Sequence, residues 1–210
     1  MATSRILFVV AVANVLAVSA ACSRRTVAPG AANGQVEAVY DKNTGRLTML
    51  TFDSNKNGTI DTWSYMDGTR IIRIEIDRDG DGKVDRWEYY DARQTLEKVG
   101  VSRANDGTPD TWAYAAPDGS LARLEISTAR NGKVTRTEFY DHDALMRAEE
   151  DTDGDGRIDK WETYLNGAVS TVAFDTTRRG TPDRRLTYLP DGRVRVEVDL
   201  SGSREFKPVR

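Results

Sequence analysis

The sequence repeats itself with a fixed period from residue 53 onward. Six consecutive units of 24 or 25 residues follow one another, and a partial unit, "NGQVEAVYDKNTGRLTMLTF", precedes them. Two of the six are "DRDGDGKVDRWEYYDARQTLEKVGV" and "DTDGDGRIDKWETYLNGAVSTVAF". Such a period indicates a repeat protein, in which each unit buries its apolar side chains against its neighbours. Residues 35–210 are therefore predicted to form one continuous repeat domain.

Apolar and polar residues alternate within each unit, which is typical of half-buried β-strands. In the second half of one unit, Ile72, Ile74 and Ile76 are expected to share one face. In the first half of the next, Trp87 and Tyr89 occupy every second position. Four units carry a tight-turn dipeptide between these halves, suited to the positive φ of a short hairpin: Asp67-Gly68, Asp118-Gly119, Asn166-Gly167 and Asp191-Gly192. Each unit thus predicts strand, hairpin turn, strand and loop.

Together the units predict an all-β fold, an antiparallel meander of roughly fourteen strands. Open twisted sheets rarely exceed about ten strands without curling, and an apolar face needs a cover. We therefore expect the sheet to curl into a barrel-like or spiral shell with tryptophans and aliphatic side chains inside. Flat solenoid stacking is the alternative.

Half of each unit resembles a known bacterial repeat. The stretches "YDKNTGRLTMLTFD", "YYDARQTLEKV" and "YLPDGRVRVEVD" are similar to the tyrosine-aspartate repeats of bacterial surface and toxin-encapsulating proteins. That resemblance implies long sheets built from β-hairpins.

Two acidic loops place oxygen-bearing residues at the spacing of a calcium-binding loop. Such a loop uses positions 1, 3, 5, 7 (by its carbonyl), 9 and 12, with glycine at 6. From residue 77 the candidate ligands are Asp77, Asp79, Asp81, Lys83 by its carbonyl, Asp85 and Glu88. From residue 151 they are Asp151, Asp153, Asp155, Arg157 by its carbonyl, Asp159 and Glu162. Both stretches resemble the EF-hand loop and the DxDxDG calcium motifs of non-helical scaffolds.

Electrostatics supports Ca²⁺ as the cofactor of these loops. Several carboxylates within one tight turn repel one another, and a divalent cation removes that repulsion while supplying hard oxygen ligation. Magnesium suits such a loop poorly, because it requires a small octahedron and retains its waters. The competing interpretation is that Asp, Asn and Gly simply form good turns. A third loop carries less charge and is expected to bind more weakly; its candidate ligands are Asp53, Asn55, Asn57 and Asp61.

The segments that flank the acidic loops are predicted to be strands, not helices. The stretch "YMDGTRIIRIEI" before residue 77 contains a turn and then an alternating β-branched run. The reach of Glu88 and Glu162 therefore depends on how the chain leaves the loop. The remaining loops have lost acidic ligands but contain arginine, and we hypothesise that guanidinium groups or plain turn hydrogen bonds replace the cation there. The arginines are Arg103, Arg130, Arg178 and Arg179.

The N-terminal residues predict export. Residues 1–21 contain the apolar run "ILFVVAVANVLAVSAA" and are interpreted as a secretory signal peptide. The following "VSAAC" resembles the lipobox of bacterial lipoproteins, which implies that Cys22 is acylated and, with Ser23 after it, that the protein reaches the outer membrane. The alternative is ordinary cleavage that leaves a stray thiol. Residues 22–34 are expected to form a flexible tether.

Catalytic motifs have little support in this sequence. His142 is the only histidine and lies in the hairpin turn "YDHDAL", and Cys22 is the only cysteine. Zinc sites and Cys-His nucleophiles are therefore excluded, and we predict that the protein is not an enzyme. The net charge is −3 and the arginines interleave with acids, so no nucleic-acid partner is expected.

The sequence therefore predicts a calcium-binding outer-membrane lipoprotein, periplasmic or surface-facing, that serves as a structural or interaction module. Ca²⁺ would order the inter-hairpin loops, with an affinity of about 10⁻⁴ to 10⁻³ M, as in extracellular modules. The expected partners are the membrane, through the lipid anchor, and a protein or glycan. The alternatives are a surface adhesin that binds carbohydrate or protein through an aromatic face, and, with less support, a carboxylate-dependent hydrolase.

Overall fold

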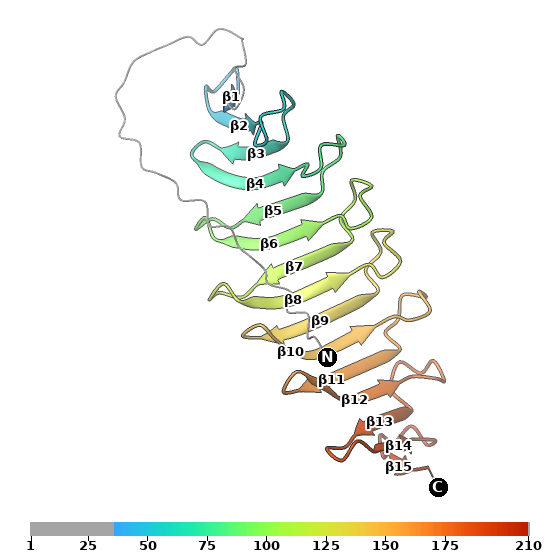
Figure 1. Cartoon of the computed structure of the whole chain (residues 1–210). Helices are drawn as coiled ribbons and strands as arrows, with labels where there is room; N and C mark the ends of the chain where they lie inside the picture. Colours follow the sequence, from blue (N-terminus) through green and yellow to red (C-terminus); the bar gives the residue numbers. More distant parts are fainter. Residues whose placement is uncertain (1–35, 210) are drawn as a thin grey trace. The chain divides into compact units, whose positions relative to one another are not determined.

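The computed structural model describes residues 36–209, which form a single antiparallel sheet of fifteen strands in sequence order, β1 to β15 (Figure 1). The predicted signal peptide, Cys22 and the tether lie outside the described residues. The strands are β1 (Glu37–Tyr40), β2 (Leu47–Phe52), β3 (Thr62–Asp67), β4 (Arg70–Ile76), β5 (Arg86–Tyr90), β6 (Leu96–Val101), β7 (Thr111–Ala115), β8 (Leu121–Ile126), β9 (Arg136–Asp141), β10 (Ala144–Glu150), β11 (Lys160–Leu165), β12 (Ala168–Phe174), β13 (Arg184–Tyr188), β14 (Val194–Val198) and β15 (Lys207–Pro208).

The all-β meander is confirmed, with one short strand more than the sequence predicts. Hairpin turns follow the odd strands along one edge of the sheet, and the acidic loops follow the even strands along the other (Figure 1). We call the second edge the loop edge. Asn166 and Gly167 at one hairpin tip have φ of 52° and 77°, the left-handed conformation that short hairpins require.

The sheet is open and does not close into a barrel. Its outer strands β1 and β15 each pair with a single neighbour. The expected interior of tryptophans and aliphatic side chains is accordingly not formed: among the described residues, Trp87, Ala148 and Val172 are the only buried apolar side chains. The physical reason is that neither face needs a second layer, because charged and aromatic side chains cover each face from within the sheet.

A β-bulge recurs next to the hairpin turns. Tyr65 pairs with Arg73 while Met66 pairs with Ile71, which leaves Ile72 as the extra residue of β4. The same shift occurs in five further hairpins of the described sheet, and bulges of this kind increase the local twist. Alternation slips by one at the bulge, so Ile71 rather than Ile72 shares the face of Ile74. The prediction for Ile72 was therefore wrong, and its side chain is 48% exposed.

From β3 to β10, one face of the sheet alternates strands that carry aromatic rings with strands that carry Arg or Lys, and we call it the aromatic face. Directly opposed residues share a face, so Trp87 lies beside Glu75 on β4 and Gly100 on β6. The guanidinium of Arg73 stacks 4.0 Å from the centre of the Tyr65 ring, and Lys98 Nζ lies 4.8 Å from the Trp112 ring. These cations cover the Tyr65 and Trp112 rings. Trp63, Trp112 and Trp161 are half-buried.

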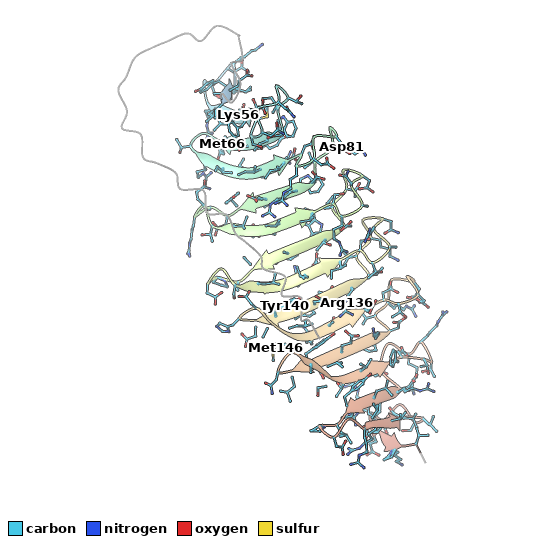
Figure 2. All side chains as sticks on the ribbon, viewed as in Figure 1. Lys56, Met66, Asp81, Arg136, Tyr140 and Met146 are labelled. Carbon is cyan, nitrogen blue, oxygen red and sulfur yellow. The ribbon has the colours of Figure 1, made fainter. Side chains whose placement is uncertain are left out.

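The opposite face carries a charged pattern on three odd strands, and we call it the network face. On β5, Arg86 Nε donates to Glu88 Oε1 at 2.6 Å and the Tyr90 hydroxyl donates to Glu88 Oε2 at 2.8 Å. The same basic, Glu, Tyr spacing recurs on β9 as Arg136, Glu138 and Tyr140, and on β11 as Lys160, Glu162 and Tyr164. Figure 2 labels Arg136 and Tyr140 within the sheet and Asp81 at the loop edge.

Candidate metal sites at the loop edge

Six loops of nine residues join the even strands to the odd strands that follow: 53–61, 77–85, 102–110, 127–135, 151–159 and 175–183. Backbone hydrogen bonds connect each loop to the next: Asp77 N donates to Asp61 O at 2.8 Å, and Ser102 N donates to Asp85 O at 2.8 Å. The same bond recurs down to Asp199 N, at the first position of the last loop, 199–206, which donates to Asp183 O. First and ninth loop positions thus form a continuous ladder, which we call the spine.

Side chains at the first loop position accept hydrogen bonds from the backbone of their own loop. Asp77 Oδ1 accepts from Gly80 N at 2.7 Å, and Asp77 Oδ2 accepts from Gly82 N at 2.8 Å. Asp151 repeats both bonds with Gly154 and Gly156, at the same distances. Gly82 has a φ of 86°, so the predicted glycine at position 6 is required by the backbone.

Side chains at the ninth position close the loop from its other end. Asp110 accepts from the backbone N–H groups of Arg103 and Ala104 and from the Arg103 Nε and Thr111 hydroxyl, at 2.8 to 3.1 Å. Spine residues account for most of the buried polar side chains: Asp53, Asp61, Asp77, Ser102, Asp110, Ser127, Thr135, Asp151, Asp175, Asp183 and Asp199. The tightest packing of the described molecule is therefore polar and lies under the loop edge.

The loop 127–135 lacks acidic residues and keeps the same geometry with hydroxyl groups. Ser127 Oγ accepts from Asn131 N at 3.1 Å, and the hydroxyls of Thr128 and Thr135 lie 2.7 Å apart. Sequence reasoning missed this role of positions 1 and 9, although the recurrence of Asp, Ser or Thr at both positions could have indicated it. The arginine hypothesis holds for Arg103, which binds Asp110 of its own loop, whereas the Arg130 side chain makes no hydrogen bond or ion pair among the described residues.

The spine carboxylates are stabilised in their ionised form. Burial alone would raise the pKa of Asp110, but hydrogen bonds from Arg103, Thr111 and the Ala104 N–H outweigh it and lower the pKa. The pKa of Asp183 is likewise lowered, because hydrogen bonds from Thr177 and Thr176 outweigh burial. The same balance lowers the pKa of Asp61 and of Asp175.

These pKa shifts predict destabilisation in acid. A carboxyl group whose pKa is lower in the folded state stabilises the fold above its unfolded pKa, about 3.9 for Asp, and loses that contribution as the pH falls through the folded value. We expect the urea midpoint to be flat between about pH 5 and 7 and to fall steeply below about pH 4. Urea unfolding at a series of pH values in chelator tests this; an unchanged midpoint from pH 5 to 3 would contradict it.

Two groups of three aspartates have the arrangement of a metal site. In each group, one carboxylate oxygen from every member lies within 4.8 Å of the others. The first group is Asp77, Asp79 and Asp85, and the second is Asp151, Asp153 and Asp159. They are positions 1, 3 and 9 of the predicted calcium loops. The spine fixes positions 1 and 9, and position 3 projects from the exposed part of the loop.

Position 5 lies outside these groups. Asp81 Oδ1 accepts from Lys83 N at 2.8 Å, and its Oδ2 accepts from Asn105 Nδ2 at 3.2 Å. Asp155 repeats the first bond with Arg157 N at 2.8 Å. Asp81 and Asp155 therefore stabilise the turn beside each group by accepting backbone hydrogen bonds. The backbone carbonyls of Lys83 and Arg157 remain predicted ligands.

The structure does not bring Glu88 and Glu162 to the aspartate groups. Both lie on strands of the network face, where Glu88 is bound by Arg86 and Tyr90. Glu162 accepts from Arg136 and Tyr164, each at 2.7 Å, and pairs with Lys160 at 2.8 Å. An EF-hand helix would turn position 12 back toward the loop, but a strand carries it away along the sheet. Their prediction as calcium ligands is corrected to a role in the charged network.

The loop at 53–61 gathers fewer charges, as the sequence predicts. Asp53 accepts from Gly58 N at 2.8 Å, and Asn55 and Asn57 accept from backbone N–H groups of the same loop. Asp61 is bound by the Ser54 and Thr62 hydroxyls at 2.7 and 2.8 Å. The loop therefore holds its shape through its own hydrogen bonds, and its two carboxylates form no group of three.

Fold and loops together define a class of protein, an open antiparallel β-meander with EF-hand-like acidic loops along one edge. The EF hand family model matches residues 74–90. That match spans the end of β4, the loop and all of β5. It covers a small part of the chain, and strands stand where the two helices of an EF hand would be.

Comparisons with whole proteins add little. No curated protein matches the sequence. A solved structure with partial likeness is that of accessory secretory protein 1, 2 and 3 in Streptococcus pneumoniae, with a TM-score of 0.25 and 12% identity. The likeness covers 67% of this chain and 19% of that chain, so it spans about a fifth of the length of the matched chain. Within residues 36–209, no helix is long and apolar enough to cross a bilayer.

Proposed function

We propose that this protein is an exported calcium-binding module in which Ca²⁺ orders the loop edge of a β-repeat sheet. The observation that carries the proposal is the pair of three-aspartate groups, one of which lies within the stretch matched by the EF hand family. Each group brings three acidic side chains together, and a hard divalent cation would offset their repulsion, which Arg178 and Lys133 offset in part at the second group.

The residues present fit calcium ligation. Asp77, Asp79 and Asp85 would hold the ion in the first loop, and Asp151, Asp153 and Asp159 in the second. Calcium accepts six to eight oxygen ligands in flexible geometry, so backbone carbonyls and water would complete the shell. Without the bidentate glutamate of position 12, a weak affinity of about 10⁻⁴ to 10⁻³ M is expected, as in extracellular modules.

The proposed role of the ion is structural. First and ninth positions are already fixed by the spine, whereas Asp79 and Asp153 are exposed. Ca²⁺ would tie position 3 to the spine and so stiffen the part of each loop that projects from the sheet. In this proposal, acylation of Cys22 anchors the module in the outer membrane, and the stiffened sheet presents a surface to a protein or glycan partner.

Thermal unfolding of the chain without residues 1–21 tests calcium binding. We expect excess Ca²⁺ to raise the midpoint by several degrees over chelator, because a ligand that binds only the folded state stabilises it by RT ln(1 + [L]/Kd). Equal midpoints, together with no heat of binding in calorimetric titration, would refute the proposal.

The double variant Asp79→Ala, Asp153→Ala is the sharper test. It removes one ligand from each group but no spine residue, so the metal-free midpoint is expected to change little while the calcium-dependent rise is lost. Asp118→Ala is the matched control, because Asp118 is an aspartate of a hairpin turn at the opposite edge. The control should keep the full response to calcium.

A further inference from the structure

The two acidic loops have nearly the same sequence but different neighbours. The first reads "DRDGDGKVD" and the second "DTDGDGRID", and the hydrogen bonds from Gly80 and Gly82 in one match those from Gly154 and Gly156 in the other. Within the loops, Arg78 stands at position 2 of the first, and Thr152, whose hydroxyl donates to Asp159 Oδ2 at 2.8 Å, at position 2 of the second. The ion pairs to members of the groups come from neighbouring loops.

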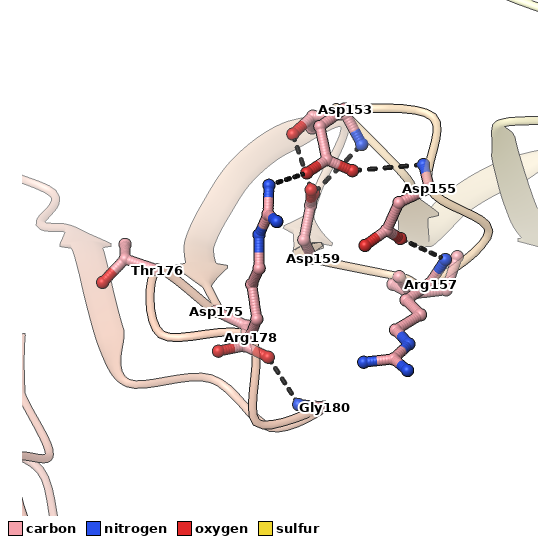
Figure 3. Close-up of a pocket in the computed structure, with 10 residues that line it drawn as sticks. Asp153, Asp155, Arg157, Asp159, Asp175, Thr176, Arg178 and Gly180 are labelled. Carbon is pink, nitrogen blue, oxygen red and sulfur yellow. Dashed lines mark hydrogen bonds and ion pairs between the residues drawn. The ribbon is translucent and has the colours of Figure 1, made fainter.

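The loop that follows each site supplies one donor from its fourth position. Asn105 Nδ2 donates to Asp79 Oδ2 at 2.9 Å, across 26 residues of sequence. At the second site a guanidinium nitrogen of Arg178 donates to Asp153 Oδ2 at 2.7 Å, across 25 residues (Figure 3). Asn105 and Arg178 both have positive φ, of 55° and 59°, so the backbone presents them in the same way. One donor is neutral and the other carries a full positive charge.

The loop that precedes each site adds to this contrast. Lys133, at the seventh position of its loop, lies with its Nζ 3.9 Å from Asp151 Oδ2 and donates to Gly154 O. The equivalent residue before the first site is Thr59, which has no charge. The second aspartate group is thus contacted by a cation from each side. At the first site, Lys83 pairs at 3.3 Å with Asp81, which lies outside the group, and the neighbour that contacts the group is the neutral Asn105 amide.

We propose that Arg178 and Lys133 act as built-in competitors of calcium at the loop 151–159, so that the loop 77–85 binds calcium first and more tightly. This inference rests on the proposed calcium function. A cation at the second site must share Asp153 with Arg178 or displace the guanidinium, whereas at the first site the Asn105 amide bonds to Asp79 without repelling the ion. Arg178 and Asp153 are 72% and 39% exposed, so solvent screens the repulsion and keeps it moderate.

A pocket between the loops 151–159 and 175–183 can hold the Arg178 guanidinium whether or not calcium binds Asp153. Its lining includes Asp153, Asp155, Asp159, Asp175 and Arg178, and Arg178 extends across it toward Asp153 in Figure 3. When calcium takes Asp153, the guanidinium can turn within this pocket, whose lining also holds the acidic side chains of Asp155 and Asp175. The second site would therefore fill only at higher calcium concentrations, as the second step of a graded response.

Single-site variants separate the two affinities. In the Asp153→Ala variant only the loop 77–85 keeps its three aspartates for calcium, and in the Asp79→Ala variant only the loop 151–159 keeps them. Titration of metal-depleted protein with calcium in a calorimeter should give a Kd at least about tenfold lower for the first loop, which corresponds to about 1.4 kcal/mol. The ratio between the two Kd values should fall as the salt concentration rises, because the competing charges are exposed and salt screens them.

An exchange of the two neighbours is the decisive experiment. Arg178→Asn in the Asp79→Ala background should tighten the second loop about tenfold, with a further gain from Lys133→Thr, and Asn105→Arg in the Asp153→Ala background should weaken the first loop about tenfold. Circular dichroism of each metal-free variant checks the fold. If both loops bind calcium and the exchanges change neither Kd by more than about twofold, the competitor inference is wrong and the calcium proposal stands. If no calcium binds to the unmutated chain, the proposed function itself falls.

Discussion

Replacing Asp110 with alanine is expected to lower the free energy of unfolding by about 3 kcal/mol. Asp110 is 2% exposed, and its carboxylate accepts four hydrogen bonds, two of them from the backbone N–H groups of Arg103 and Ala104. Leaving such donors unsatisfied costs more than the mean value of a hydrogen bond, particularly where the lost partner is charged. Urea unfolding in chelator, so that no metal contributes, is the measurement.

A control variant and the region that loses hydrogen-exchange protection make the prediction for Asp110→Ala specific. Asp118→Ala removes an aspartate of a hairpin turn, where solvent replaces the lost acceptor, and should change stability little. Hydrogen exchange should show lost protection mainly at the loop 102–110 and the strand ends beside it, because each unit of a repeat protein contacts only its neighbours. A loss of stability as small as that of the control would argue against the spine as the main support of the loop edge.

Arg136→Ala is expected to cost about 3 kcal/mol as well, for a reason that belongs to the network face. Arg136 donates to Glu138 at 2.8 Å, to Glu150 at 3.0 Å and to Glu162 at 2.7 Å, which links β9, β10 and β11. Its removal leaves Glu150 and Glu162 with Lys160 as their remaining cation, and Glu138 with the Tyr140 hydroxyl. Urea unfolding at neutral pH tests this, with Arg193→Ala at an exposed hairpin tip as the control.

The same network predicts how that variant responds to pH. Burial would raise the pKa of Glu162, but hydrogen bonds from Lys160, Arg136 and Tyr164 outweigh it and lower the pKa to about 2. This contribution is complete above about pH 4.5 and is lost as the pH falls toward 2. The difference in stability between the unmutated chain and Arg136→Ala should therefore shrink over that range. A difference that stays constant down to pH 2 would contradict the role given to Arg136.

The losses in the free energy of unfolding expected for Asp110→Ala and Arg136→Ala explain how a single-layer sheet is stable. The described residues bury few apolar side chains, and Trp87 is the largest of them, at 9% exposure. Stability comes instead from many short-range elements: the buried spine at the loop edge, ion pairs on the network face and cations stacked on rings on the aromatic face. Gly100 belongs to this packing, because a Cβ there would lie 2.7 Å from the Trp112 ring.

Local sequence patterns determined the strands, the hairpins and the aspartate groups of this protein. Alternation has a period of two and turn residues act within four positions, so strands, hairpins and their order could be derived from the sequence alone. The aspartates at positions 1, 3 and 9 also come from a single nine-residue loop, and their grouping depends on no distant segment. Asp77, Asp79 and Asp85 were predicted as ligands for that reason, and the structure brings them together.

Tertiary structure decided what local spacing cannot express. The sheet remains open because its side chains cover both faces without a second layer, and the recurrent bulge moves residues such as Ile72 out of the simple alternation. Glu88 matches position 12 by count but follows a strand, so its direction is set by the sheet rather than by the loop. The partners of Asp79 and Asp153 lie 26 and 25 residues further along the chain, where strand register alone places Asn105 beside one and Arg178 beside the other.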